Sequence, residues 1–462
     1  MNTIGDIMAS KSVAVIGASW DSTKSGSQLL QVLQNVGFKG RITGVNPQEG
    51  EVFGVPLYRK IDDIPFDVDL AVLLIPPAAV PAALNDCVRK GVKGVVISSE
   101  GFAETGSQGA QYQEEIRKIL KESGMRGIGP NTLGIVNTET KLTSSHFSNI
   151  QMLQPGSIGL IAQSGIFVGA LLRYLSSFDG LRISKGLGLG NKVDIDESDA
   201  LAYLMDDEQT KIIGMYLEDI RDGRRFMDVC RRAVARKPVL IVKGGRTQEG
   251  AATSASHTAS LAVADTLFDG AMRQAGVLRM TGIDELIWTI RGFLTMPLPN
   301  GPSLAFVTYS GAQAIMSIDT AMEEGLTIAR FGSASREQIG RVISMPSKLK
   351  NPIDFFPDMV AHGFEKTSIE ILNALMDDDN VHGIVFISYA NFGAEPYKEI
   401  VNLLKKKRTK PVFFSLLGSK EELQIIQAFM DENNFPCYDF PETAVRVFSR
   451  MWTYARSRGR KG

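Results

Sequence analysis

The 462-residue sequence has only three cysteines, and this scarcity excludes several kinds of protein. Cys87, Cys230 and Cys437 are isolated and odd in number, so neither a disulfide framework nor a zinc site is expected. No apolar run approaches the roughly 18 residues of a membrane span, and Met1–Lys11 has no basic-then-apolar signal pattern. These absences predict a cytoplasmic protein in a reducing compartment, with no membrane partner.

The sequence also lacks an excess of charge of either sign. Its 50 Lys and Arg residues nearly balance its 51 Asp and Glu residues, and the formal net charge is −1. A protein that attracts nucleic acid or an anionic membrane through its overall field needs a clear positive excess. We therefore expect no nucleic acid partner, and any phosphate group must be bound by local features.

Short apolar segments alternate with longer amphipathic segments along the whole chain. This alternation predicts an α/β fold of mostly parallel sheets covered by helices on both faces. We expect three consecutive Rossmann-like or flavodoxin-like domains, at residues 1–130, 150–296 and 303–462, since the chain is too long for one. The expected strands are Ser12–Ile16, Ile42–Val45, Leu70–Ile75, Gly94–Ser98, Ser157–Ala162, Ile212–Leu217, Pro238–Lys243, Ser303–Thr308, Gly383–Ser388 and Pro411–Leu416.

The expected domain borders have two different compositions. Asn131–Leu153 is a stretch of polar and small residues without a helical or strand period. Pro297–Pro302 has the prolines and glycine of a linker, which do not suit the interior of an element.

The first expected strand runs directly into a turn of small residues. Gly17, Ala18 and Ser19 form this turn, and Gly26 then begins a helix, an order that places a pyrophosphate at the helix N-terminus. Lys24 lies between the turn and the helix, where its cation suits a phosphate; a solvated loop lysine is the alternative. The pattern predicts a nucleotide-like ligand.

Residues after the later strands restrict the kind of nucleotide. An NAD site needs an acidic residue after the second strand to bind the ribose hydroxyls, and Asn46 and Pro47 occupy that place. The segments Ile75–Pro77 and Ser98–Gly101 follow later strands, on the side where open α/β sheets bind ligands. NAD is therefore disfavoured, and the expected ligand is nucleotide-like but need not be a dinucleotide.

A strand followed by Ser-Gly and an apolar helix occurs twice, at Ser164-Gly165 and at Ser310-Gly311. Such a turn exposes unpaired N–H groups at a helix N-terminus, where the helix dipole favours an oxyanion. For either copy alone, a tight turn with a helix cap is the simpler explanation. The duplication favours a site in which two turns hold one phosphate.

One of the four histidines lies in an unusual segment. His257 is surrounded by small and polar residues, Gly244–Ser260, which have little apolar surface to hold them in place. A neutral imidazole on a movable segment can accept a phosphoryl group and pass it on. Glu218 directly follows an expected strand and is placed to orient the ring; a flexible-loop histidine beside an unrelated glutamate is the alternative. The histidines expected in surface or capping roles are His146, His362 and His382.

Together these motifs resemble the NDP-forming acyl-CoA synthetases of the succinyl-CoA synthetase superfamily, over essentially the whole chain and as the α subunit. Further matching motifs are Gly190–Asp194, Tyr216–Glu218, Ser256–Thr258 and Asn351–Asp354. The resemblance implies CoA-binding roles for Gly17, Ala18, Ser19, Lys24, Ser25, Gly26, Val45, Asn46, Pro47, Ile75, Pro76, Ser98 and Glu100. It implies phosphate or acyl roles for Asn131, Gln163, Ser164, Gly165, Ser310, Gly311 and Ala312.

The resemblance also implies a reaction. Acyl-CoA and phosphate give an acyl phosphate and CoA, His257 takes the phosphoryl group with Glu218 as its orienting partner, and ADP receives it to form ATP. It implies a separate ATP-grasp β subunit that binds ADP or ATP with Mg, in an α2β2 assembly, and no metal in this chain. Acetyl-CoA is the expected acyl donor, and larger acids are the alternative.

Departures from the family pattern leave other classes open. Gln48 stands where relatives often have lysine, and Trp20–Thr23 lacks the usual proline. Ala312 and Ala259 replace glycines that are common in relatives. The alternatives are a CoA-sensing regulatory module without turnover and a nicotinamide-dependent oxidoreductase. Retention of His257 and Glu218 argues against the first, and Asn46 argues against the second.

Overall fold

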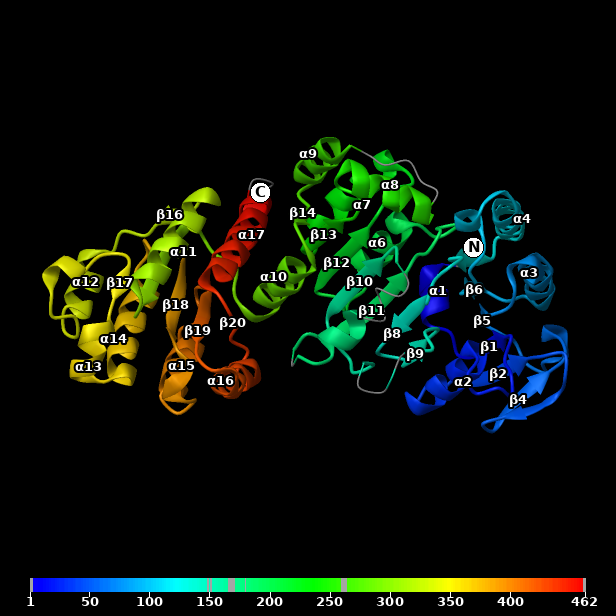
Figure 1. The fold of residues 1–462 in the computed structure, drawn as a ribbon, viewed down its shortest axis with the longest axis horizontal. Coiled ribbons are helices and arrows are strands. Elements are labelled where there is room, and N and C mark those ends of the chain that lie inside the picture. The colour runs from blue at the N-terminus through cyan, green and yellow to red at the C-terminus, as the bar shows by residue number, and fades with distance from the viewer. Residues whose placement is uncertain are drawn as a thin grey trace. The chain divides into compact units, whose positions relative to one another are not determined.

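The computed structural model describes residues 3–147, 149, 152–164, 171–178, 180–258 and 264–459. They form two compact units, Met1–Thr281 and Gly282–Gly462. The first unit contains two sheets and the second contains one, and all three are mostly parallel with helices beside them (Figure 1). The expected α/β fold class is confirmed. Within the described ranges, no helix combines the length and apolar character that a membrane crossing needs.

The first sheet has the strand order β3-β4-β2-β1-β5-β6-β7, and all neighbours are parallel except β3 and β4. Its central strand β1 is buried at every residue, as expected of a parallel strand covered on both faces. Its elements are α1 (Ile4–Met8), β1 (Ser12–Ile16), α2 (Ser25–Asn35), β2 (Arg41–Val45), β3 (Gly50–Val52), β4 (Val55–Tyr58), η1 (Ile61–Asp63), β5 (Leu70–Leu73), η2 (Pro77–Ala79), α3 (Val80–Lys90), β6 (Gly94–Ile97), η3 (Ala103–Thr105), α4 (Ser107–Ser123) and β7 (Arg126–Ile128).

The second sheet has the order β14-β13-β12-β10-β11-β8-β9. Its elements are β8 (Ile135–Asn137), β9 (Leu142–Thr143), β10 (Ile158–Ala162), β11 (Ile183–Gly188), α6 (Glu197–Asp206), β12 (Ile212–Leu217), α7 (Gly223–Val234), β13 (Val239–Lys243), α8 (Gln248–Thr258), α9 (Asp265–Ala275) and β14 (Leu278–Met280). The antiparallel edge strands β8 and β9 lie where the sequence indicated no period. They are too short to produce the alternation that predicts a strand.

Backbone hydrogen bonds join the two sheets of the first unit. The N–H of Val193 donates to the carbonyl of Gly129 at 2.9 Å, and the N–H of Asn191 donates to the carbonyl of Pro130 at 2.9 Å. Arg126 adds ion pairs to Asp194 at 2.8 Å and to Asp199 at 3.3 Å. The ends of the two sheets are thereby held together within one unit, so the borders of the three expected domains stay a prediction.

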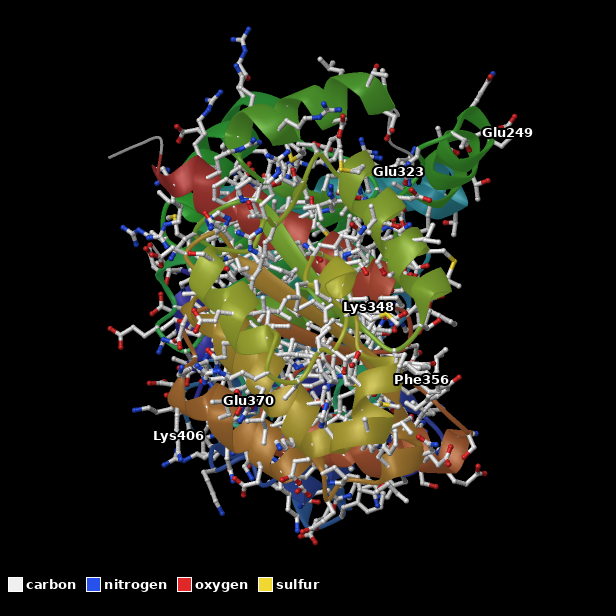
Figure 2. The ribbon with its side chains drawn as sticks, turned by 90° about the vertical axis from the view of Figure 1, so that its left-hand side faces the viewer. Glu249, Glu323, Lys348, Phe356, Glu370 and Lys406 are labelled. Atoms are coloured by element: carbon white, nitrogen blue, oxygen red, sulfur yellow. The ribbon has the colours of Figure 1, made fainter. Side chains whose placement is uncertain are left out.

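The second unit has a parallel sheet of order β16-β15-β18-β19-β20, with β17 also paired to β15. Charged side chains such as Glu370 of α14 and Lys406 of α15 lie on its helices (Figure 2). Its elements are α10 (Ile283–Thr295), β15 (Ser303–Thr308), α11 (Gly311–Glu323), β16 (Thr327–Ile328), α12 (Ser333–Ile339), η4 (Pro346–Lys348), β17 (Ile353–Asp354), α13 (Phe356–His362), α14 (Phe364–Asp377), β18 (Gly383–Tyr389), η5 (Ala390–Phe392), α15 (Tyr397–Lys406), β19 (Val412–Leu417), α16 (Lys420–Glu432), β20 (Cys437–Tyr438) and α17 (Pro441–Gly459).

Asn351, which belongs to one of the motifs quoted above, joins strands of this sheet. Its Oδ1 accepts the N–H of Phe306 at 2.9 Å. Its Nδ2 donates to the carbonyls of Leu304 at 2.8 Å and Ala329 at 3.2 Å. The side chain thus satisfies backbone groups of β15 and of the segment after β16, which is a structural task.

Candidate functional site

The turn between β1 and α2 brings backbone very close to backbone. Gly17 has a φ of +99°, in the left-handed region that favours glycine. A Cβ added to Gly26, at the start of α2, would lie 2.3 Å from the carbonyl oxygen of Gly17. Both glycines are therefore required for the helix N-terminus to sit against the end of β1, as a phosphate-binding turn needs.

Asn46 holds this turn in place from the end of β2. Its Nδ2 donates to the carbonyl of Ala18 at 2.6 Å, and its Oδ1 accepts the N–H of Gln48 at 2.9 Å. The N–H of Gly17 donates to the carbonyl of Val45 at 3.1 Å. The amide of Asn46 is thus engaged inside the protein, as a support for the turn.

The CoA-binding residues that the sequence predicts gather at one edge of the first sheet. Strands β2, β1, β5 and β6 are adjacent and parallel, so their carboxyl ends share that edge. Lys24 and Pro47 are exposed there, and Lys24 precedes α2 without capping it through its side chain. The residues that follow these four strand ends or begin α2 are Gly17, Ala18, Ser19, Ser25, Gly26, Asn46, Ile75, Pro76, Ser98 and Glu100.

A cavity of about 290 Å³ in the first unit brings both of its sheets into one site. Predicted residues contribute from each side: Ser25, Ser98 and Glu100 from the first sheet, and Asn131, Gln163, Ser164 and Glu218 from the second sheet and the segment before it. The other lining residues are Leu74, Thr132, Leu133, His146, Phe147, Gly190 and Asn191. The structure thus joins the expected CoA-binding edge to the expected phosphate residues.

Glu218 directly follows β12, as the sequence predicts. Hydrogen bonds with neighbouring side chains hold its backbone and its carboxylate in place. Gln163 Oε1 accepts the backbone N–H of Glu218 at 2.8 Å and that of Asp219 at 3.1 Å. The hydroxyl of Tyr216 donates to Glu218 Oε1 at 3.3 Å. Burial, together with the negative charge of Glu218, raises the pKa of Tyr216 to about 12, so the phenol keeps its proton and remains a donor.

A buried lysine forms hydrogen bonds with residues that hold the segment of Glu218. Lys192 Nζ donates to Glu197 Oε2 at 3.0 Å and also to Asp219 Oδ1. The Lys192 side chain is 4% exposed and that of Glu197 is fully buried. Lys192 Nζ lies 3.5 Å from Gln163 Oε1, so one network fixes Asp219, Gln163 and the segment that carries Glu218.

Glu104 connects the loop after β6 to the segment after β11. Its Oε1 accepts the N–H groups of Gly101 at 2.8 Å and Phe102 at 3.0 Å, and its Oε2 accepts Asn191 Nδ2 at 2.6 Å. Burial favours the protonated carboxyl, but these hydrogen bonds outweigh it and lower the pKa of Glu104. The charged form ties Asn191, which lines the cavity, to the loop that carries Glu100.

The segment around His257 is a helix, whereas the sequence indicated a loop. Helix α8 covers Gln248–Thr258, and it packs beside η3, which follows the predicted loop Ser98–Gly101. Alanines favour the helix, and Thr247 Oγ1 accepts the N–H of Gly250 at 3.0 Å near its start. The backbone of His257 therefore lies near the C-terminus of α8, while its side chain is outside the described part of the structure.

The two Ser-Gly turns are described to different extents. Ser164 follows β10 and lines the cavity, while Gly165 lies outside the described residues. Ser310 precedes α11, which Gly311 and Ala312 begin, and its N–H donates to Thr308 Oγ1 at 2.9 Å. The second turn is thus at a helix N-terminus, as expected, and the joint binding of one phosphate stays a prediction.

The structure adds cavity residues to which the sequence gave no site role, among them His146, which was expected in a surface or capping role. His146 and Phe147, whose ring centroids are 4.1 Å apart, follow β9 and contribute an imidazole and an apolar ring. Leu133 and Thr132 line the same cavity. A histidine without a second ligand at metal spacing gave no functional signal, because only the fold brings it to the cavity that Ser164 and Glu218 also line.

Two family models match the two regions of the chain that contribute to this site. Residues 11–138 match the CoA binding domain, and residues 155–293 match the succinyl-CoA ligase like flavodoxin domain. The cavity is lined from both regions. The fold and the site thus define a CoA-binding domain joined to a domain of the succinyl-CoA ligase type.

Individual relatives identify the family more closely. The chain is 36% identical to the ADP-forming acetate–CoA ligase II of Archaeoglobus fulgidus, over 98% of this chain and 67% of the relative. It is 33% identical to the alpha subunit of the ADP-forming acetate–CoA ligase II of Pyrococcus furiosus, over 97% of both chains. The structure of dinucleotide forming acetyl-coenzyme A synthetase 1 from Ca. Korarchaeum cryptofilum, in complex with phosphate and ADP, matches with a TM-score of 0.90 and 29% identity over 99% of this chain and 98% of that one. The chain belongs to the ADP-forming acetate–CoA ligase family.

Proposed function

We propose that this chain is the α subunit of an ADP-forming acetate–CoA ligase, in which acetyl-CoA, phosphate and ADP give acetate, CoA and ATP. The observation that carries the proposal is the cavity that joins the CoA-binding edge to Ser164 and Glu218. A reaction between a CoA thioester and phosphate needs both reactants in one enclosed place. Family membership supports the same activity.

In the proposed mechanism, CoA lies along the carboxyl edge of the first sheet with its thioester in the cavity. An oxygen of phosphate attacks the thioester carbonyl carbon, the carbon–sulfur bond breaks, and the phosphate proton passes to the leaving sulfur. His257 then takes the phosphoryl group from the acyl phosphate and releases acetate. Glu218 accepts a ring N–H of His257, which fixes the tautomer and stabilises the charge that develops on the ring.

N–H groups at helix starts support the phosphoryl group in this proposal. The turn after Ser164 and the residues Ser310, Gly311 and Ala312 keep the phosphate roles that the sequence predicts, because a helix N-terminus favours an oxyanion. Preorganised donors of this kind also stabilise charge during phosphoryl transfer.

The second half of the reaction requires a partner in this proposal. The relative from Pyrococcus furiosus is an alpha subunit and matches almost end to end, whereas the relative from Archaeoglobus fulgidus extends well beyond the matched region. We propose that an ATP-grasp β subunit binds ADP or ATP with Mg, receives the phosphoryl group from His257 and forms an α2β2 assembly with this chain.

The direct test mixes the purified chain with a candidate β subunit, acetyl-CoA, phosphate and ADP. ATP formation that requires all components supports the ligase. CoA binding without ATP formation would instead support a regulatory module, and NADH formation from a supplied alcohol or aldehyde would support an oxidoreductase. Replacing acetyl-CoA with branched or aryl thioesters measures the acyl preference.

Replacing Glu218 with Gln should lower the yield of phosphohistidine at least roughly tenfold, because an amide cannot stabilise the positive charge on the ring. Radiolabel on the chain after mixing with acetyl-CoA and labelled phosphate measures the yield. Glu249→Gln is the matched control, since Glu249 is an exposed residue in the first turn of α8 (Figure 2). Equal yields from wild type and Glu218→Gln would assign Glu218 a purely structural role.

Replacing Gly26 with Ala should raise the dissociation constant for CoA at least roughly tenfold, since the new methyl group meets the backbone of Gly17 and α2 must shift. Isothermal titration calorimetry measures the affinity. Gly270→Ala is the control, because a Cβ at Gly270 in α9 meets nothing within 4 Å. Unchanged affinity in Gly26→Ala would show that CoA does not use this turn.

A further inference from the structure

One wall of the cavity is formed by the segment that follows β9. Ser144 Oγ donates to the carbonyl of Leu133 at 2.9 Å and accepts the N–H of Ile135 at 2.7 Å. The N–H of Phe147 donates to Ser145 Oγ at 3.3 Å. The two bonds of Ser144 fasten the segment that carries His146 to the segment that carries Leu133, while the third is local to the His146 segment.

The same wall is anchored to the sheet behind it. Thr132 Oγ1 donates to the carbonyl of Gly188 at 2.7 Å, at the end of β11. Gly134 has a φ of +76°, and a Cβ there would lie 2.2 Å from Ser144 Oγ. This close packing holds the backbone that leads to His146, and a group that acts on a reacting atom needs such a supported position.

The ring of His146 has one nitrogen enclosed and one accessible. Among the described residues, Nδ1 is buried without a hydrogen-bond partner, and no hydrogen bond to Nε2 is present either. A buried N–H without an acceptor costs roughly 1–3 kcal/mol, which disfavours a proton on Nδ1. The proton therefore belongs on Nε2, the accessible nitrogen. Burial also lowers the pKa of His146, so the ring is neutral near pH 7.

The surroundings of His146 in the cavity suit the acyl end of a substrate. Leu133 and Phe147 are its apolar neighbours in the same wall, while Gln163, Ser164 and Glu218 line the cavity from the second sheet. No Lys or Arg is among the lining residues that the structure describes. A negative charge that develops on a carbonyl oxygen here must therefore be stabilised by neutral donors.

We infer that His146 is a catalytic residue of the acyl-transfer step, and that its Nε2–H donates to the carbonyl oxygen of the bound acyl thioester. This inference rests on the proposed function and adds a residue to it. As phosphate attacks the carbonyl carbon, the carbonyl oxygen becomes negative, and the hydrogen bond from Nε2 strengthens. The carbon–sulfur bond then breaks, the carbonyl re-forms as acyl phosphate, and the phosphate proton leaves on CoA. His146 keeps its proton throughout.

The test compares two replacements of similar size. In His146→Gln, the side-chain amide places an N–H donor near the position of Nε2, whereas His146→Leu fills the space without a donor. His257 is labelled from two directions, from acetyl-CoA with radiolabelled phosphate and from radiolabelled ATP in the presence of the partner subunit. Only the first direction includes the acyl-transfer step.

We expect His146→Leu to slow labelling from acetyl-CoA and phosphate by roughly 100-fold and to leave labelling from ATP unchanged. His146→Gln should recover most of the lost rate. Wild-type rates in His146→Leu, or equal losses in both directions, would overturn the inference, because the second result indicates a structural role. If the wild-type chain is labelled from neither direction, the proposed function itself fails, and the inference fails with it.

Discussion

The His257→Ala variant should take up no radiolabelled phosphate from acetyl-CoA and phosphate, and ATP formation should fall by at least roughly 1,000-fold. In the proposed mechanism, the acyl phosphate transfers its phosphoryl group to the imidazole of His257 before ADP receives it, so loss of this ring removes the covalent route. Acid-labile, base-stable label on the chain identifies phosphohistidine. The CoA affinity of this variant should remain nearly unchanged, because none of the residues with a predicted CoA-binding role lies on α8.

His362→Ala is the matched control for this variant. His362 is an exposed residue at the end of α13 in the second unit, so its loss should change neither labelling nor turnover. Label that persists at the wild-type level in His257→Ala would reject His257 as the phosphate carrier. Loss of label together with loss of CoA binding would indicate a damaged fold, which circular dichroism and thermal unfolding would detect.

The Lys192→Met variant should lose roughly 3–5 kcal/mol of unfolding free energy, because two carboxylates would remain buried without their cation. Glu197 is fully buried, and Asp219 is largely buried beside it. Urea denaturation, followed at the unfolding transition of the first unit, measures the loss of unfolding free energy. Adding Glu197→Leu to the Lys192→Met variant should restore part of the lost unfolding free energy. The double variant no longer buries the Glu197 carboxylate, whose cation is missing once Lys192 is replaced.

Lys192→Met should also reduce phosphohistidine yield, because the network that fixes Gln163 and Asp219 is lost. Lys185→Met provides the comparison. Lys185 is another buried lysine of the second sheet, and it pairs with Glu139 and Asp207 away from the cavity. The Lys185→Met substitution should destabilise the protein without a specific loss of phosphohistidine labelling. Equal losses of activity at equal stability in both variants would show that Lys192 has no particular link to the site.

The α/β class and most strand positions could be predicted from local patterns. The expected strands Ser12–Ile16, Ile212–Leu217 and Ser303–Thr308 agree with β1, β12 and β15 residue for residue. Parallel strands buried on both faces form continuous apolar runs, which is a strong local signal. The short strands β8 and β9 carry no such signal, and β8 pairs with β11, more than 40 residues away, while β9 adds to β8 at the edge of the sheet.

The candidate site was predictable only in part, for a similar reason. Glu218 and Ser164 follow strands, so their position at a sheet edge can be derived from the sequence. The helix around His257 was missed, because its weak apolar pattern favoured a loop. His146 was missed as well, since a single histidine outside any motif has no recognisable spacing.

By itself, the sequence determined the central strands of the parallel sheets, the glycine turn after β1, the position of Glu218 at a strand end and the short motifs that carry the family resemblance. Each of these depends on residues that are close together in the chain. Only the tertiary structure decided that two sheets share one cavity and that His146 and Ser164 both line it. It also decided that Lys192 lies within hydrogen-bonding distance of Gln163. Such contacts join residues from distant parts of the chain, and packing rather than local pattern selects them.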